Sequence, residues 1–196
     1  MFNDKTLNKL VEKYGPPPKR ADRSEFLYEE LIESIIGQQL SNKAADTIFN
    51  RFLSLFPKNK FPRPEMLLKT GDEKLRSAGM SYGKASYIKN IAKAFVDKTI
   101  DVRKLQKIED AEVIKELTKI KGVGNWTAEM ILMFTFGRTD VFSLGDAGLR
   151  KAIKTLYKIE KDKEILKLSE KWKPNRSLAC WYLWRSLENT PTVGKK

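Results

Sequence analysis

Apolar residues recur three or four positions apart along most of the chain, which is the spacing that places them on one face of an α-helix. The clearest stretches are residues 26–36, 44–52 and 85–95. Further helices are predicted at residues 6–14, 75–78, 112–119, 126–136, 146–156 and 177–187. Alternation with a period of two, the mark of a strand, is confined to the brief Asp140-Val141-Phe142. We therefore predict an all-α protein.

Local signals set several of the predicted helix boundaries. Ser24 and Ser41 are suitable N-caps for the helices that follow them, and Pro57 ends the second of these helices. We expect a loop at Phe61-Pro62-Arg63-Pro64 and a helix stop at Gly79.

Two composition breaks predict how the chain is organised. The run Gly15-Pro16-Pro17-Pro18-Lys19-Arg20 predicts a stiff linker, and a second break lies near residues 99–107. We expect two helical lobes with a central cleft, over residues 22–104 and 105–196. Residues 1–21 supply an N-terminal helix and the linker, and we expect this helix to pack on the later lobe.

Charge and composition narrow the chemistry. Lys and Arg number 38 against 25 Asp and Glu, a formal net charge of +13. This excess favours a polyanion, nucleic acid first, although a surface that only aids solubility has the same composition. One cysteine and no histidine exclude an internal disulfide, a His/Cys zinc site, a four-thiolate iron–sulfur cluster and a histidine general base. Cys180 lies in an apolar run, so we expect a buried structural thiol.

The chain shows no sign of export or of membrane insertion. It has no secretory signal at its start and no apolar run long enough to span a bilayer. We expect an intracellular protein, in the cytoplasm or nucleoid, or in the nucleus of a eukaryote.

The most informative local pattern is Ile120-Lys121-Gly122-Val123-Gly124, between two predicted helices. Glycine permits positive φ and close backbone approach, and the next helix begins with N–H groups suited to a phosphate. A plain turn between packed helices is the alternative.

With Leu117-Thr118-Lys119 before it and Asn125-Trp126-Thr127-Ala128 after it, this turn resembles the helix-hairpin-helix of base-excision DNA glycosylases. Asp146 follows twenty residues after Trp126, in a stretch that resembles the loop and Asp of that superfamily's signature. Residues 36–41, 79–85 and 172–177 are similar to stretches of its 3-methyladenine (alkylated-base) branch. The resemblance covers residues from about 22 to 188.

The resemblance implies that Asp146 is catalytic. A carboxylate beside the deoxyribose stabilises the charge that develops as the N-glycosidic bond breaks, and it orients or deprotonates the attacking water. Asp is also suited to N-cap the following helix, and the two roles are compatible. Members that also cut the strand have a lysine where this chain has Trp126, and an indole forms no Schiff base. The resemblance therefore implies a monofunctional enzyme that leaves an abasic site.

Aromatic side chains are expected to select the damaged base. Alkylation makes a purine cationic, and electron-rich rings attract it by stacking and by cation–π contact. By resemblance, Trp126 and Trp184 line the base pocket and Tyr82 is a third candidate. Ordinary core packing is the alternative for each.

The remaining implied roles concern DNA. The target base must leave the duplex, and by resemblance Gln39 intercalates in its place, with Leu40 and Ser41 in the minor groove. A helix cap or a backbone contact is the alternative for Gln39. The candidate phosphate contacts are the N–H groups of Gly122, Gly124 and Trp126 and the side chains of Lys121, Lys84 and Lys151. The carbonyls of Thr118, Ile120 and Val123 match those that hold a structural Na+ or K+ ion in the family. We expect no required cofactor.

The implied function is base excision repair. The enzyme would act as a monomer on double-stranded DNA with a damaged base, hydrolysing the N-glycosyl bond of alkylated purines such as 3-methyladenine. Two alternatives stay open. In the first, the enzyme acts on a deaminated, oxidised or mispaired base instead of an alkylated one. In the second, the chain binds DNA structures without catalysis, and the presence of an acid at position 146 disfavours this second alternative.

Overall fold

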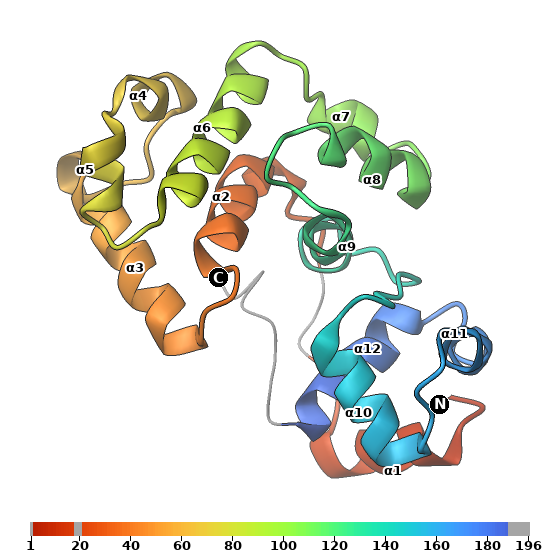
Figure 1. The fold of residues 1–196 in the computed structure, drawn as a ribbon. Coiled ribbons are helices and arrows are strands. Elements are labelled where there is room, and N and C mark those ends of the chain that lie inside the picture. The colour runs from red at the N-terminus through yellow and green to blue at the C-terminus, as the bar shows by residue number, and fades with distance from the viewer. Residues whose placement is uncertain (1, 18–20, 188–196) are drawn as a thin grey trace. The chain divides into compact units, whose positions relative to one another are not determined.

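The computed structural model describes residues 2–17 and 21–187, and every regular element in these ranges is helical (Figure 1). The α-helices are α1 (Lys5–Tyr14), α2 (Leu27–Gly37), α3 (Asn42–Ser54), α4 (Pro64–Lys69), α5 (Asp72–Arg76), α6 (Tyr82–Val96), α7 (Val102–Leu105), α8 (Asp110–Thr118), α9 (Asn125–Phe134), α10 (Ala147–Tyr157), α11 (Asp162–Glu170) and α12 (Arg176–Ser186). The 3-10 turn η1 (Ser24–Phe26) precedes α2, and η2 (Pro57–Asn59) follows α3. The predicted all-α class is confirmed. None of the described helices combines the length and apolar character needed to cross a membrane.

The chain divides into two compact units. Within the described ranges, one contains residues 23–131, and the other joins residues 2–17 and 21–22 to residues 132–187. The boundary falls inside α9, whereas the composition break placed it between residues 104 and 105. Side-chain hydrogen bonds join residues after 104 to the unit of residues 23–131. Gln106 Nε2 donates to Ser24 Oγ at 2.6 Å, and Asn90 Nδ2 donates to the Lys121 carbonyl at 3.0 Å.

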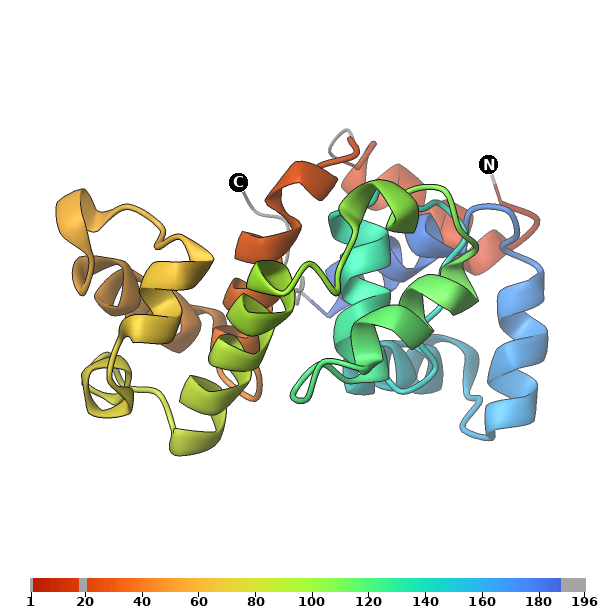
Figure 2. The same cartoon turned by 90° about the horizontal axis from the view of Figure 1, so that it is seen from above.

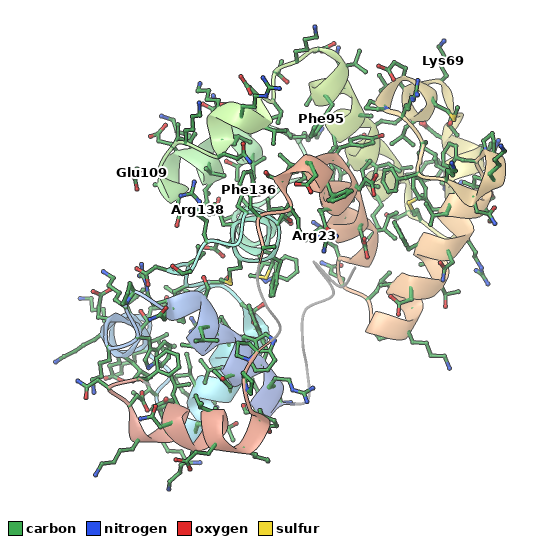
Figure 3. All side chains as sticks on the ribbon, turned by 180° about the vertical axis from the view of Figure 1, so that it is seen from behind. Arg23, Lys69, Phe95, Glu109, Phe136 and Arg138 are labelled. Atoms are coloured by element: carbon green, nitrogen blue, oxygen red, sulfur yellow. The ribbon has the colours of Figure 1, made fainter. Side chains whose placement is uncertain are left out.

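In the unit of residues 23–131, α2 packs against both α3 and α6, and α4 packs on α6 (Figures 1 and 2). Phe95 of α6, labelled in Figure 3, meets the ring of Tyr28 in α2 edge-on, with 5.2 Å between the ring centroids. The buried face of α2 carries Leu31, Ile32, Ile35 and Ile36. Burying each such side chain contributes about 1.5–3 kcal/mol. This core fixes the end of α2 relative to the start of α6.

In the other unit, α1 and α10 both pack on α12. Asp4 anchors α1, because its Oδ1 caps the helix by accepting from the N–H groups of Thr6 and Leu7. Its Oδ2 accepts from the Tyr157 hydroxyl and from the Trp172 indole N–H, both at 2.9 Å. The first helix is thus bonded to side chains 153 and 168 positions later in the chain.

One local prediction far from the hairpin is wrong, and one brief strand-like alternation has no counterpart in the structure. Ser24 does not cap α2, because it begins η1 and its hydroxyl accepts from Gln106 instead. Residues 140–142 form no strand, since the Val141 N–H donates to the Ser177 hydroxyl at 2.9 Å.

Other local predictions are confirmed. Ser41 Oγ caps α3, which ends before Pro57, and Cys180 is fully buried. Helices α4, α7 and α11 were not predicted, because they are short or carry few apolar positions. Residues 18–20 of the predicted linker lie outside the described ranges.

Candidate active site

Asp146 stands at the start of α10 and is buried, with 7% of its surface exposed. Its backbone is extended, and its Oδ1 accepts a 2.7 Å hydrogen bond from the Leu149 N–H, which is the geometry of an N-cap. The same oxygen accepts a second hydrogen bond, at 2.9 Å, from the indole Nε1 of Trp184 in α12. Donors from two helices therefore orient the carboxylate, and the cap expected as an alternative is present.

Trp184 supports Asp146 from within the core. It is 1% exposed, and its ring lies 5.8 Å from that of Phe134. Gly148 leaves room for this contact, because a Cβ there would stand 3.1 Å from Asp146 Oδ1 and 3.2 Å from Trp184 Cδ1. Sequence reasoning expected Trp184 as a pocket wall and missed its hydrogen bond to Asp146, 38 positions away.

The loop that leads to Asp146 is fastened by the start of α12. Arg176 forms a bidentate ion pair with Asp140, in which Nε donates to Oδ1 at 2.8 Å and Nη2 donates to Oδ2 at 3.0 Å. Burial opposes ionisation of Asp140, but the hydrogen bonds and charge of Arg176 outweigh it and lower the pKa of that carboxyl. Ser177 Oγ donates to the carbonyl of Arg138, labelled in Figure 3, at 2.7 Å. No local pattern in the sequence indicates these contacts, because their partners lie 36 and 39 positions apart.

The predicted hairpin joins α8 to α9 beside α6 (Figures 1 and 2). The Val123 N–H closes the turn by donating to the Ile120 carbonyl at 2.9 Å, and the Val123 side chain is buried. Gly122 has a φ of +108°, and a Cβ there would lie 2.3 Å from Tyr87 Cγ. Both the dihedral angle and the contact require glycine.

The start of α9 carries several groups predicted to meet DNA. The Gly124 carbonyl accepts the 3.0 Å hydrogen bond from Ala128 N, Trp126 is half-buried in the first turn of α9, and Lys121 is exposed. Trp126 belongs to the unit of residues 23–131, whereas Asp146 belongs to the other unit. In the part of the chain that the structure describes, no three His, Cys, Asp or Glu side chains are grouped to hold a metal ion.

The turn between α2 and α3 exposes the residues predicted to enter the duplex. Leu40 N donates to the Gly37 carbonyl at 3.2 Å, and Gln39 has a φ of +59°. The side chains of Gln39 and Leu40 are exposed. Gln38 Nε2 donates to Thr127 Oγ1 at 3.2 Å, which brings this turn beside the first turn of α9.

Tyr82, a candidate for the base pocket, contacts α5. It is 60% exposed, its hydroxyl donates to Glu73 at 2.9 Å, and the Arg76 guanidinium lies 3.5 Å above its ring. One ring face is therefore covered by a cation, and contact with a base stays a prediction.

Lys84 is bonded to the end of α2, and its expected contact with a phosphate stays a prediction. Its Nζ donates to the carbonyls of Ile36 and Gln38, at 2.8 and 2.7 Å. Burial lowers the pKa of this amine. The ammonium of Lys84 thus donates hydrogen bonds to backbone carbonyls at the end of α2.

Known proteins share this arrangement. A family model described as HhH-GPD superfamily base excision DNA repair protein matches residues 32–175, which include the α2–α3 turn, the hairpin and Asp146. The chain belongs to the HhH-GPD superfamily. The DNA-3-methyladenine glycosylase 1 of Schizosaccharomyces pombe is 38% identical over 188 residues, which are 94% of this chain and 82% of the relative.

Solved structures of the superfamily agree. The 3-methyladenine DNA glycosylase Mag1 of S. pombe, in complex with abasic DNA, is similar with a TM-score of 0.86 and 36% identity, covering 95% of this chain and 93% of Mag1. A DNA-3-methyladenine glycosidase from Bacillus halodurans has a TM-score of 0.76 and 36% identity, covering 93% of this chain and 84% of its own. The predicted superfamily and its 3-methyladenine branch are confirmed.

Proposed function

We propose that this chain is a monofunctional DNA glycosylase that flips alkylated purines out of double-stranded DNA and hydrolyses their N-glycosidic bond. The observation that carries the proposal is the buried carboxylate of Asp146, which the Leu149 N–H and the Trp184 indole hold at the start of α10. The names of the relatives from S. pombe and B. halodurans support an alkylated purine as the substrate.

In the proposed reaction, Asp146 acts on the sugar. The bond from C1′ to the purine nitrogen breaks, and the base leaves with the electron pair. A base that alkylation has made cationic leaves neutral, so it needs no strong general acid. The carboxylate stabilises the positive charge on the sugar, and water then bonds to C1′ and loses a proton to the carboxylate.

Trp126 decides between two kinds of product. Cleavage of the strand through a Schiff base needs an amine, and the indole at this position has none. The proposed product is therefore an intact strand with an abasic site. The Trp126 ring selects the cationic base by cation–π attraction of about 0.5–2 kcal/mol.

The hairpin serves as the phosphate contact in this proposal. The N–H groups of Gly122, Gly124 and Trp126 stand in or beside a turn that precedes a helix, where anions bind. The exposed Lys121 adds positive charge. A monovalent cation on the carbonyls of Thr118, Ile120 and Val123 stays a prediction. The Ile120 carbonyl already accepts from Val123 N, and its second lone pair suits such an ion.

Incubation with N-methylated duplex DNA tests the function. We expect release of methylated purines, measured by chromatography, and strand breaks only after alkali treatment. Strand breaks without alkali would contradict the monofunctional assignment.

Duplexes with one defined lesion test the substrate class. We expect 3-methyladenine to be released faster than uracil or 8-oxoguanine. Faster release of either of those two would assign the enzyme to deaminated or oxidised bases. Binding to DNA with no release from any lesion would favour the non-catalytic alternative.

A further inference from the structure

The turn that carries Gln39 has a backbone form that glutamine rarely adopts. Gln38 has φ −51° and ψ 131°, Gln39 has φ +59°, and Leu40 N donates to the Gly37 carbonyl. These features define a type II turn, in which the third position favours glycine because its φ is positive. With glutamine there, the alternative type I turn, with negative φ, is intrinsically easier.

The two turn types differ in the orientation of their central peptide group. In a type II turn this group is flipped relative to type I, and here its carbonyl belongs to Gln38. Lys84 Nζ donates to that carbonyl at 2.7 Å and to the Ile36 carbonyl at 2.8 Å. A flip of the central peptide would turn the Gln38 carbonyl away and break the first bond. The ammonium therefore favours the type II form.

Lys84 is itself held in place. It lies in the first turn of α6, where its N–H donates to the capping hydroxyl of Ser81 at 3.2 Å. Its positive charge also suits the carbonyl end of α2. On the other side of the turn, Gln38 Nε2 donates to Thr127 Oγ1 of α9. The turn is thus bonded to two helices, and Gln39 and Leu40 are left exposed.

We propose that Lys84 is a positioning residue that holds the Gly37–Leu40 turn in its type II form and so presents Gln39 and Leu40 for insertion into the duplex. This inference rests on the proposed function, in which Gln39 fills the place of the flipped base. Lys84 acts through the turn and touches neither the base nor the sugar.

Lys84→Met removes the ammonium and keeps the aliphatic stem, and Lys93→Met is its matched control. Lys93 lies on the same helix, carries the same charge and pairs with Asp97 at 2.7 Å. We expect Lys84→Met to lower the single-turnover rate of base release about tenfold, which is within the roughly hundredfold loss that a misplacement of 1 Å can cause. We also expect a smaller rise in fluorescence from 2-aminopurine beside the lesion. Lys93→Met should change neither, and Lys84→Arg should recover most of the loss.

A double variant tests whether Lys84 acts through Gln39. In a Gln39→Ala background, Lys84→Met should cause a smaller loss of rate than in the wild type, because only the part that acts through Leu40 remains. An equal loss in both backgrounds, or a Lys84→Met rate equal to that of Lys93→Met, would overturn the inference and leave the proposed function standing. If the wild-type chain releases no base, the proposed function fails and this inference fails with it.

Thermal unfolding supplies a readout that does not depend on activity. Glycine adopts positive φ without a clamp, so Gln39→Gly should restore the melting temperature that Lys84→Met lowers. A Lys84→Met, Gln39→Gly double variant that melts no higher than Lys84→Met alone would contradict the role of Lys84 in the turn. This comparison holds even where Lys84→Met is too unstable to assay.

Discussion

Asp146, Trp184 and Gly148 form a small, tightly packed group in which each residue constrains the others. The carboxylate accepts from the indole, and both lie within 3.2 Å of the position that a Cβ on Gly148 would take. A misplacement of about 1 Å can slow a catalysed reaction by about a hundredfold. The absence of a side chain at position 148 is therefore a requirement of the proposed site.

Gly148→Ala tests this requirement. The new methyl group displaces the Asp146–Trp184 pair by a few tenths of an ångström, and we expect base release to slow roughly tenfold. Stability should change little, because alanine favours the helix by about 1 kcal/mol over glycine and offsets the crowding. Gly71→Ala, where a Cβ would meet nothing within 4 Å, is the control. A Gly148→Ala rate equal to that of the control would show that the pair tolerates displacement.

Sequence reasoning works for single residues when their signal is local. The N-cap role of Asp146 follows from its place just before a predicted helix, and the structure confirms it, whereas its catalytic role rests on the hairpin and this loop taken together and stays a prediction. The hydrogen bond from Trp184 and the clamp of Arg176 on Asp140 join residues 36 or more positions apart. Only packing in three dimensions creates such pairs, so no spacing in the sequence indicated them.

At the scale of elements, the hairpin was predicted because its glycines carry the turn by themselves. Gly122 takes a φ of +108° and lies against the Tyr87 ring, while Val123 closes the turn. Helix α11 (Asp162–Glu170) was missed, since charged residues fill most of its positions. Its helical form comes from packing Ile165 and Leu168 into the core, which a weak apolar pattern does not reveal.

Gly122→Ala should destabilise the hairpin. A Cβ 2.3 Å from Tyr87 Cγ forces the ring or the turn to move, and alanine also disfavours the positive φ. We expect the free energy of unfolding to fall by about 2–4 kcal/mol in denaturant titrations, the sum of crowding and backbone strain. Gly124→Ala, with no atom within 4 Å of its Cβ, should stay within about 0.5 kcal/mol of wild type. Equal midpoints for the two variants would refute this explanation.

At the scale of the molecule, hydrogen bonds join the first helix to residues more than 150 positions later in the chain. Asp4 caps α1 and accepts from Tyr157 and Trp172, so the first helix belongs to the unit that also holds Asp146. The sequence indicated α1, α10 and α12 of this unit but not where the units divide. That division depends on distant bonds such as Gln106 to Ser24, which a composition break does not report.

Asp4→Ala tests how much these hydrogen bonds of Asp4 stabilise the unit. The change removes an N-cap, which costs about 1 kcal/mol, and leaves two partly buried donors without their acceptor, at about 1–3 kcal/mol for a buried group. We expect a loss of about 2–4 kcal/mol in the free energy of unfolding, followed by denaturant titration. Asn3→Ala, at an exposed neighbouring position, is the control and should unfold as the wild type does. Equal stability of the two variants would mean that α1 adds nothing to the unit.

The central claim is that Asp146 supplies the chemistry of base release, and Asp146→Asn tests it most directly. Asparagine keeps a side-chain oxygen that accepts from Leu149 and Trp184, but it carries no negative charge. The measurement is single-turnover release of methylated purine from methylated duplex DNA by the wild type and by Asp146→Asn, with DNA affinity measured alongside. We expect release by the wild type to be lost in the variant, at about two orders of magnitude or more, while affinity is largely kept. Full activity of Asp146→Asn would contradict the proposed mechanism.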